Sequence, residues 1–218
     1  MKILLTAALV LLSTAARCQK IKNKAPSADD WLEKTQFYTG TGLEIIEVHD
    51  RRDGLPFFSS HPMVFNFALG GNYVFAHKDD FLSLSANPNI HLALGWFSGG
   101  GLNFMFQAPI FLLGRIGAGC TNFNQQKIGV GLGVGLNYTY YALPYQISSF
   151  YARMSINFVA PAACAELNLR LRSGAFGFRF HINLLPFNDE IQRGFDLVPV
   201  RYMNYGFGLM WYFNTLFD

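Results

Sequence analysis

Histidine, cysteine and carboxylate side chains are the groups in this chain that could hold a metal ion or act in acid–base catalysis. No pair of histidines has a ligand-like spacing with a nearby cysteine or carboxylate. We therefore expect no metal site, and no motif predicts a cofactor. The histidines are His49, His61, His77, His91 and His181.

The cysteines offer a second possible chemistry, a disulfide. Cys18 lies in a segment that we expect to be removed, which leaves Cys120 and Cys164. These two fall on segments that we place two strands apart, so we expect two buried free thiols. One disulfide in an oxidising compartment is the alternative.

Charged side chains and histidines also fall on the less apolar face of segments in which apolar residues alternate with small or polar ones. Buried charges must be paired, so two acids and four arginines predict a network that fills an interior. A sharper hypothesis is a polar plug that rearranges to pass small solutes, with the excess of cations favouring anions. These residues are Glu44, Arg115, Arg153, Glu166, Arg170, Arg179, His91 and His181.

A run of alternating glycines, Gly129 to Gly135, could suggest a phosphate-binding loop. That motif needs a different glycine spacing and a following helix. Glycine at every second position instead predicts one face of a strand.

The elements that must position these residues are strands. From Met203 to Phe213 every second residue is large and apolar, and the residues between include Asn204, Gly206 and Gly208. Such alternation has the period of a strand. Eight segments carry it, at about residues 38–49, 65–75, 82–97, 102–117, 127–141, 149–172, 176–184 and 203–213.

The sixth segment is irregular. Its alternation slips by one residue between Phe158 and Leu167, around Pro161. We expect a bulge or kink there.

The less apolar face distinguishes a membrane barrel from a soluble one. A soluble ligand-carrying barrel would present charged residues to water on that face, but here it carries Gly, Asn, Ala, Ser and Thr. Small uncharged residues fit the crowded interior of a closed eight-stranded barrel. We therefore predict an all-β, eight-stranded antiparallel transmembrane β-barrel with up-and-down meander topology, with short turns at one end and the longer connections 50–62 and 186–200 at the other.

The N-terminus has the features of an export signal over residues 1–18: a lysine, an apolar stretch and small residues before Cys18. Lipidation of Cys18 is the alternative, disfavoured by Arg17. Removing Lys2 and Arg17 from the 17 basic residues leaves 15 against 14 acidic ones, a net charge of +1 that predicts no nucleic-acid partner. Residues 19–37 are expected to be a tail, and residues 38–218 the barrel.

The chain resembles the small outer-membrane β-barrel proteins of Gram-negative bacteria, in particular OmpA/OmpX-like barrels of the Bacteroidota type. The resemblance rests on the signal followed by Gln19, the eight segments and a terminal strand similar to the barrel-assembly signal. The last residue departs from the pattern, because it is Asp218 instead of an aromatic. The resemblance implies location in the outer membrane, a periplasmic tail, contact with outer-membrane lipid and lipopolysaccharide, and recognition by the barrel-assembly machinery. The matching residues are Asn204, Gly206, Leu209 and Trp211.

Some barrels of this size are lipid A deacylases with a His-x-Ser pair. The residue two positions after each histidine is never serine here, so we expect no enzymatic activity. The expected external connections carry charged and aromatic residues that could bind a surface partner or lipopolysaccharide. We expect a structural or surface-interaction protein, with a narrow pore and a soluble periplasmic carrier as alternatives. The connection residues are Arg51, Arg52, Phe57, Phe58, Arg193 and Phe195.

Overall fold

The computed structural model describes residues 34–52, 63–78, 81–96, 102–122, 125–147, 150–171, 174–193 and 196–213. Within these residues the chain forms nine strands. They are β1 (Thr35–Asp50), β2 (Met63–Lys78), β3 (Leu82–Trp96), β4 (Leu102–Gly117), β5 (Ile128–Ile147), β6 (Phe150–Leu171), β7 (Gly174–Asn183), β8 (Phe187–Arg193) and β9 (Asp196–Phe213). The predicted signal segment lies outside the described residues.

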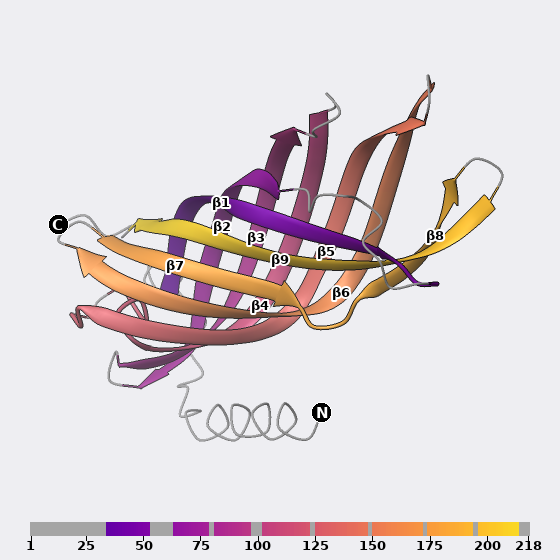
Figure 1. The fold of residues 1–218 in the computed structure, drawn as a ribbon. Coiled ribbons are helices and arrows are strands. Elements are labelled where there is room, and N and C mark those ends of the chain that lie inside the picture. Colours follow the sequence, from indigo (N-terminus) through magenta and orange to yellow (C-terminus); the bar gives the residue numbers. More distant parts are fainter. Residues whose placement is uncertain are drawn as a thin grey trace.

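Eight of these strands close into a barrel. Each strand from β1 to β7 pairs antiparallel with the next, β7 pairs with β9, and β9 pairs back onto β1. Figure 1 shows β1 in indigo beside β9 in yellow, where the first and last strands close the wall. The predicted eight-stranded antiparallel meander is confirmed.

The strands are strongly tilted. Glu44 pairs directly with Val64 of β2, whereas the path the other way round the barrel, through β9, β7, β6, β5, β4 and β3, reaches Val74 of the same strand. The difference, 74 minus 64, is a stagger of ten residues. A staggered barrel of this kind requires a strand tilt of about 35–45°.

The two ends of the barrel differ. We call the end with the β2–β3, β4–β5 and β6–β7 connections the turn end, and the opposite end the loop end. β1 begins and β9 finishes at the turn end. β8 and the start of β9 form a hairpin that projects past the wall at the loop end (Figure 1).

Three details differ from the sequence expectations. β1 begins at Thr35, inside the expected tail, and the connection 186–200 contains the β8–β9 hairpin because β9 starts at Asp196. The expected bulge or kink around Pro161 is wrong, since β6 keeps one register against β5 and β7 and its even-numbered residues stay buried from Ile156 to Asn168. The same face of β6 points into the lumen along this whole stretch. The apolar residues change parity because the lumen is lined by apolar side chains at the loop end.

Lumen-facing and outward residues alternate along the strands of the barrel wall. The register irregularity within β2–β3 lies between Val74 and Ala76. Cys120 and Cys164 are buried free thiols, as expected. Within the described residues, no helix has the length and apolar character needed to cross a membrane.

Candidate functional site

The outward-facing side chains of the barrel are large and apolar. Phe65 is 72% exposed and Leu132 is 68% exposed. A continuous apolar surface of this kind belongs in lipid. The barrel wall is therefore a membrane-facing surface, and the polar face is the inner one, which is the reverse of a soluble carrier. Other exposed side chains include Met63, Phe67, Leu69, Ile90, Leu94, Ile110, Leu136, Val159, Phe178 and Phe207.

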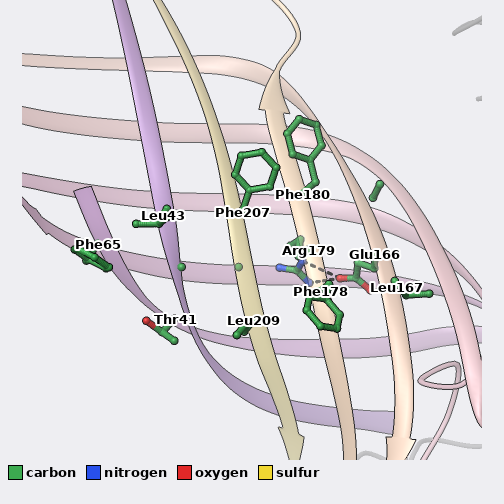
Figure 2. A pocket seen from close by; sticks show the side chains of 13 residues that line it. Thr41, Leu43, Phe65, Glu166, Leu167, Phe178, Arg179, Phe180, Phe207 and Leu209 are labelled. Carbon is green, nitrogen blue, oxygen red and sulfur yellow. Dashed lines mark hydrogen bonds and ion pairs between the residues drawn. The ribbon is translucent and has the colours of Figure 1, made fainter. Parts of the chain in front are cut away.

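One stretch of this outer wall forms a groove of about 600 Å³ across β2, β1, β9, β7 and β6. Its side chains are almost all apolar, among them Leu43, Phe178 and Phe207, drawn in Figure 2. Arg179 alternates with exposed Phe178 and Phe180 along β7, so its ion pair with Glu166 lies behind the groove, on the inner face. The groove itself can hold hydrocarbon and offers no charged group to it.

The lumen toward the turn end holds an ion-pair cluster of Arg115, Glu166 and Arg179, all buried. Arg115 Nε donates to Glu166 Oε2 at 2.7 Å, and Arg179 Nε donates to Glu166 Oε1 at 2.8 Å. Arg179 Nη2 makes a further bond to the same carboxylate. One acid thus neutralises one of two arginines and bonds both.

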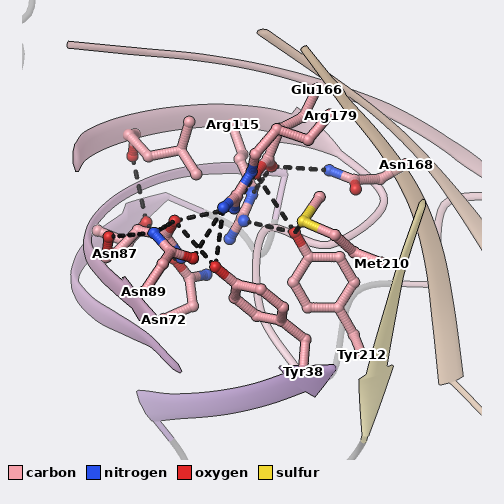
Figure 3. Close-up of polar contacts among 12 residues, drawn as sticks. Tyr38, Asn72, Asn87, Asn89, Arg115, Glu166, Asn168, Arg179, Met210 and Tyr212 are labelled. Atoms are coloured by element: carbon pink, nitrogen blue, oxygen red, sulfur yellow. Dashed lines mark hydrogen bonds and ion pairs between the residues drawn. The ribbon is translucent and has the colours of Figure 1, made fainter. Parts of the chain in front are cut away.

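Polar side chains from other strands accept further hydrogen bonds from both arginines (Figure 3). Arg115 Nη2 donates to the Tyr212 hydroxyl at 2.9 Å, and Arg179 Nη1 donates to the Tyr38 hydroxyl at 2.8 Å. Each guanidinium also lies over the ring of its tyrosine, at 5.2 and 5.1 Å from the centroid. Arg179 additionally donates to Asn87 Oδ1 and Asn89 Oδ1, each at 2.8 Å.

The remaining barrel strands also take part. β2 contributes Asn72, which bonds Gln36 of β1 and Ser85 of β3. β5 contributes space, because a Cβ on Gly131 would lie 3.1 Å from Arg115 Cγ and 3.2 Å from Glu166 Oε2. The glycine-rich face of β5 therefore leaves room for the ion-pair cluster.

Nearer the loop end, Glu44, His91 and His181 form a second buried group, which we call the Glu–His triad. His181 Nε2 lies 3.0 Å from Glu44 Oε2, and His91 Nδ1 lies 3.4 Å from Glu44 Oε1. Asn66 Nδ2 donates to Glu44 Oε1 at 2.7 Å. The spacing of the histidines along the chain gives no indication that His91 and His181 meet, because the register of β1, β3, β7 and β9 is what places them beside one carboxylate.

Both ends of the lumen are filled. At the loop end, the ring of Phe187 on β8 stacks on Phe158 with centroids 4.7 Å apart, over an apolar layer that includes Tyr202. At the turn end, residues 118–122 of the β4–β5 connection are buried, and Asn122 Nδ2 donates to the Thr35 carbonyl at 3.2 Å.

The other predicted residues are more dispersed. Arg170 is half-buried near the turn end, and Arg153 pairs with Pro144 in a stretch whose side chains lie outside the described part of the chain. Of the assembly-signal residues on β9, Asn204 and Gly206 face the lumen, while Leu209 and Trp211 face outward.

Of the predicted connection residues, Arg51 and Arg52 are exposed. Phe57, Phe58 and Phe195 lie outside the described residues, as does the side chain of Arg193.

Arg51 lines a pocket of about 690 Å³ on the outer wall at the loop end, which we call the loop-end pocket. His49 of β1 and Arg201 of β9 are paired there across the two strands, and Glu47 Oε2 lies 3.5 Å from His49 Nε2. Tyr205 donates to Glu47 at 3.0 Å. The pocket lining is Glu47, His49, Arg51, Pro186, Asn188, Arg201 and Met203.

The uncharged hydrogen-bond partners of Arg115 and Arg179 were not among the residues predicted from the sequence. Tyr38, Tyr212, Asn87 and Asn89 carry no charge, yet they hold the arginines. The available signal was that all four fall on lumen-facing positions of their strands, where a polar group needs a partner.

No family model matches the chain, and no curated protein matches it. Among solved structures, the chain is similar to Ail, the attachment invasion locus protein of Yersinia pestis, in complex with the heparin analogue sucrose octasulfate, at 12% identity and a TM-score of 0.45 over 83% of this chain and 99% of that one. It is also similar to the outer membrane protein OprG of Pseudomonas aeruginosa, at 15% identity and a TM-score of 0.47 over 83% of this chain and 97% of that one. The chain is also similar to the outer membrane protein AlkL, at 14% identity and a TM-score of 0.44, over 91% of this chain and 99% of that one.

Proposed function

We propose that this protein is an integral outer-membrane β-barrel of structural or surface-interaction type, with a closed lumen and no enzymatic activity. The observation that carries the proposal is that buried side chains occupy successive levels of the lumen in the described part of the chain. An apolar layer, the Glu–His triad, the ion-pair cluster and the buried β4–β5 connection follow one another along it.

Opening the lumen would require separating buried charges. Glu166 bonds both arginines, and their partners lie on β1, β3 and β9. Removing one partner of a buried ion pair costs about 3–5 kcal/mol, so a spontaneous rearrangement that frees these groups is rare. The cost of separating these charges argues against the pore alternative. It favours a closed lumen whose hydrogen bonds also connect the strands of the wall.

Residues 1–18 fit export, and residues 19–34 then precede β1 as a periplasmic tail. Asn204, Gly206, Leu209 and Trp211 lie on β9, the strand that closes the barrel against β1. That position suits recognition by the barrel-assembly machinery.

For surface interaction, the loop-end pocket favours anionic headgroups such as the phosphates of lipopolysaccharide. Arg51, Arg201 and His49 line it together with the single acid Glu47. Outward-facing Tyr205 and Phe207 follow on β9 toward the membrane. Basic groups directly above an apolar wall match a lipid with an anionic headgroup.

The main test is planar-bilayer recording with the refolded full chain. We expect no conductance steps, and reproducible steps would establish the pore alternative. Fractionated cells should hold the protein in the outer membrane, with a gel mobility that changes on heating. Recovery in the soluble periplasm would contradict the location.

The headgroup contact has a separate test. Double substitution Arg51→Gln and Arg201→Gln should reduce the lipopolysaccharide that co-purifies in mild detergent, whereas Lys127→Gln, at the opposite end of the barrel, should leave it unchanged. Equal retention in both variants would contradict this contact.

A further inference from the structure

Three metal-ligand side chains from three strands meet inside the barrel. Glu44 of β1, His91 of β3 and His181 of β7 each offer one ligand atom, and these atoms all lie within 4.8 Å of one another. All three residues are buried. Two imidazoles and one carboxylate are a ligand set that Zn²⁺ and related transition-metal ions use.

The distances suit a single ion. Ligands at about 2.0–2.1 Å from a tetrahedral ion lie roughly 3.3 Å apart. Here His181 Nε2 and Glu44 Oε2 are separated by 3.0 Å, and His91 Nδ1 and Glu44 Oε1 by 3.4 Å. The two contacts use different oxygens of the Glu44 carboxylate, and the three ligand atoms lie within 4.8 Å of one another, so rotation of the side chains has to draw them closer for all three to bind one ion.

Unpartnered polar groups around the triad give an independent indication. Among the described buried atoms, His91 Nδ1 contacts Glu44 Oε1 at 3.4 Å but makes no hydrogen bond. Both amide atoms of Gln107, which pairs with His91 across β3 and β4, also lack a partner. The same holds for the amide of Asn204, two residues before Gly206. Buried polar atoms without protein partners indicate a ligand or water in that space.

Gly206 keeps the space open. It pairs with both Glu44 and His181 across the neighbouring strands. A Cβ at this position would lie 2.4 Å from Glu44 Oε2 and 2.5 Å from His181 Cε1, so any side chain would displace the ligand atoms.

We propose that Glu44, His91 and His181 bind a divalent transition-metal ion of the Zn²⁺ class inside the lumen, with the remaining positions taken by amide oxygens or water. The ion then links β1, β3 and β7 on the inner face of the barrel. Because the triad is sealed between filled layers, the ion enters while the barrel folds and is retained afterwards. Imidazole ligands favour this class over Ca²⁺ or Mg²⁺, which prefer oxygen.

The test is to refold the full chain from denaturant into detergent with Zn²⁺ or Co²⁺, and then to dialyse it against a chelator. We expect a stoichiometric amount of retained zinc by elemental analysis, and for Co²⁺ the visible absorption of a four-coordinate ion. At a hundredfold excess over the dissociation constant, the melting temperature should rise by roughly 5–10 °C.

The variants His91→Gln, His181→Gln and Glu44→Gln should each lose the retained metal and the Co²⁺ absorption, and His77→Gln, an exposed histidine on β2, should keep both. Gly206→Ala should lose the metal as well, and Gly208→Ala should keep it. The heat-dependent gel shift identifies the variants that have folded, and the three ligands lie on different strands, so one folded variant is enough for a decision. Metal-free wild-type protein after refolding with Zn²⁺, or retention by a folded ligand variant, would show that the triad is only hydrogen-bonded.

Discussion

The ion-pair cluster and the Glu–His triad are both buried in the same lumen, but they differ in how far protein atoms satisfy them. Among the charged atoms of Arg115, Glu166 and Arg179, Arg115 Nη1 is the only one without a hydrogen bond, and beside them Asn168, which donates to Glu166, leaves only its Oδ1 without one. Around the triad, the amides of Gln107 and Asn204 have no hydrogen-bond partner among the described residues, and His91 Nδ1 contacts Glu44 at 3.4 Å without a hydrogen bond.

This difference separates two uses of buried polarity. A network completed by protein side chains holds the wall in one arrangement, since every displacement breaks charge-assisted bonds. A group with vacant donors and acceptors needs something from outside the chain to complete it. We therefore expect substitutions in the ion-pair cluster to act on stability alone, and substitutions near the triad to act on stability and metal retention together.

The largest effect should come from Glu166→Ala. It leaves two buried arginines without their carboxylate and should lower the free energy of unfolding by about 3–5 kcal/mol. Equilibrium unfolding in urea, followed by tryptophan fluorescence in lipid, measures it. Glu190→Gln, an exposed acid on β8, serves as the control and should change stability by less than about 0.5 kcal/mol. Similar values for both variants would mean that the cluster does not hold the wall.

Tyr212→Phe keeps the ring under Arg115 but removes the hydroxyl that accepts from Nη2. Because Nη1 has no partner either, the loss should be about 1.5–3 kcal/mol in the same unfolding experiment. Tyr205→Phe removes an outward-facing hydroxyl from the same strand and should cost less. If the two variants were equally stable, the bond to Arg115 would contribute little.

Gly206→Ala addresses the other side of the comparison. Its Cβ overlaps the triad, and overpacking of this kind costs about 1–3 kcal/mol. Gly208→Ala is a matched control on the same strand, since the nearest atom to its Cβ is the Thr41 carbonyl oxygen at 3.8 Å. The control should stay within about 0.5 kcal/mol of the parent protein. Destabilisation of both variants alike would point to a general effect on β9.

Phe187→Ala removes the ring that stacks on Phe158 at the loop end. The lost aromatic contact should cost about 0.5–1.5 kcal/mol, measured by the same unfolding midpoint, because the layers beneath remain intact. We also expect bilayer recordings to stay silent for this variant. Conductance would show that the aromatic layer, and not the ion-pair cluster, closes the lumen.

The sequence allowed the barrel to be predicted because alternation at a period of two reports directly on the two faces of a strand. Glu44, Arg115 and Glu166 were placed on the inner face by that alternation alone. Contacts between strands could not be predicted in the same way, since the stagger of ten residues decides which inward positions meet. His91 and His181 are 90 positions apart and meet only through that stagger.

The expected bulge around Pro161 fails for a related reason. It assumes that apolar residues face outward along the whole strand, but Ile156, Phe158 and Ala160 are apolar residues that face inward. The β8–β9 hairpin was missed because its strand is short and polar on the outside, so it carries no alternation signal.

The pairing of β1 with β9, which we call the seam, closes the barrel, and its register decides which side chains meet inside. Tyr38 lies on one side of the seam and Tyr212 on the other, with ring centroids 5.1 Å apart, and each accepts a hydrogen bond from a different arginine. A slip of one residue during closure would turn one of these hydroxyls out of the lumen and leave an arginine unsatisfied. The interior therefore selects the register of barrel closure, because the pairing of β1 with β9 is stable only in the register that satisfies both arginines.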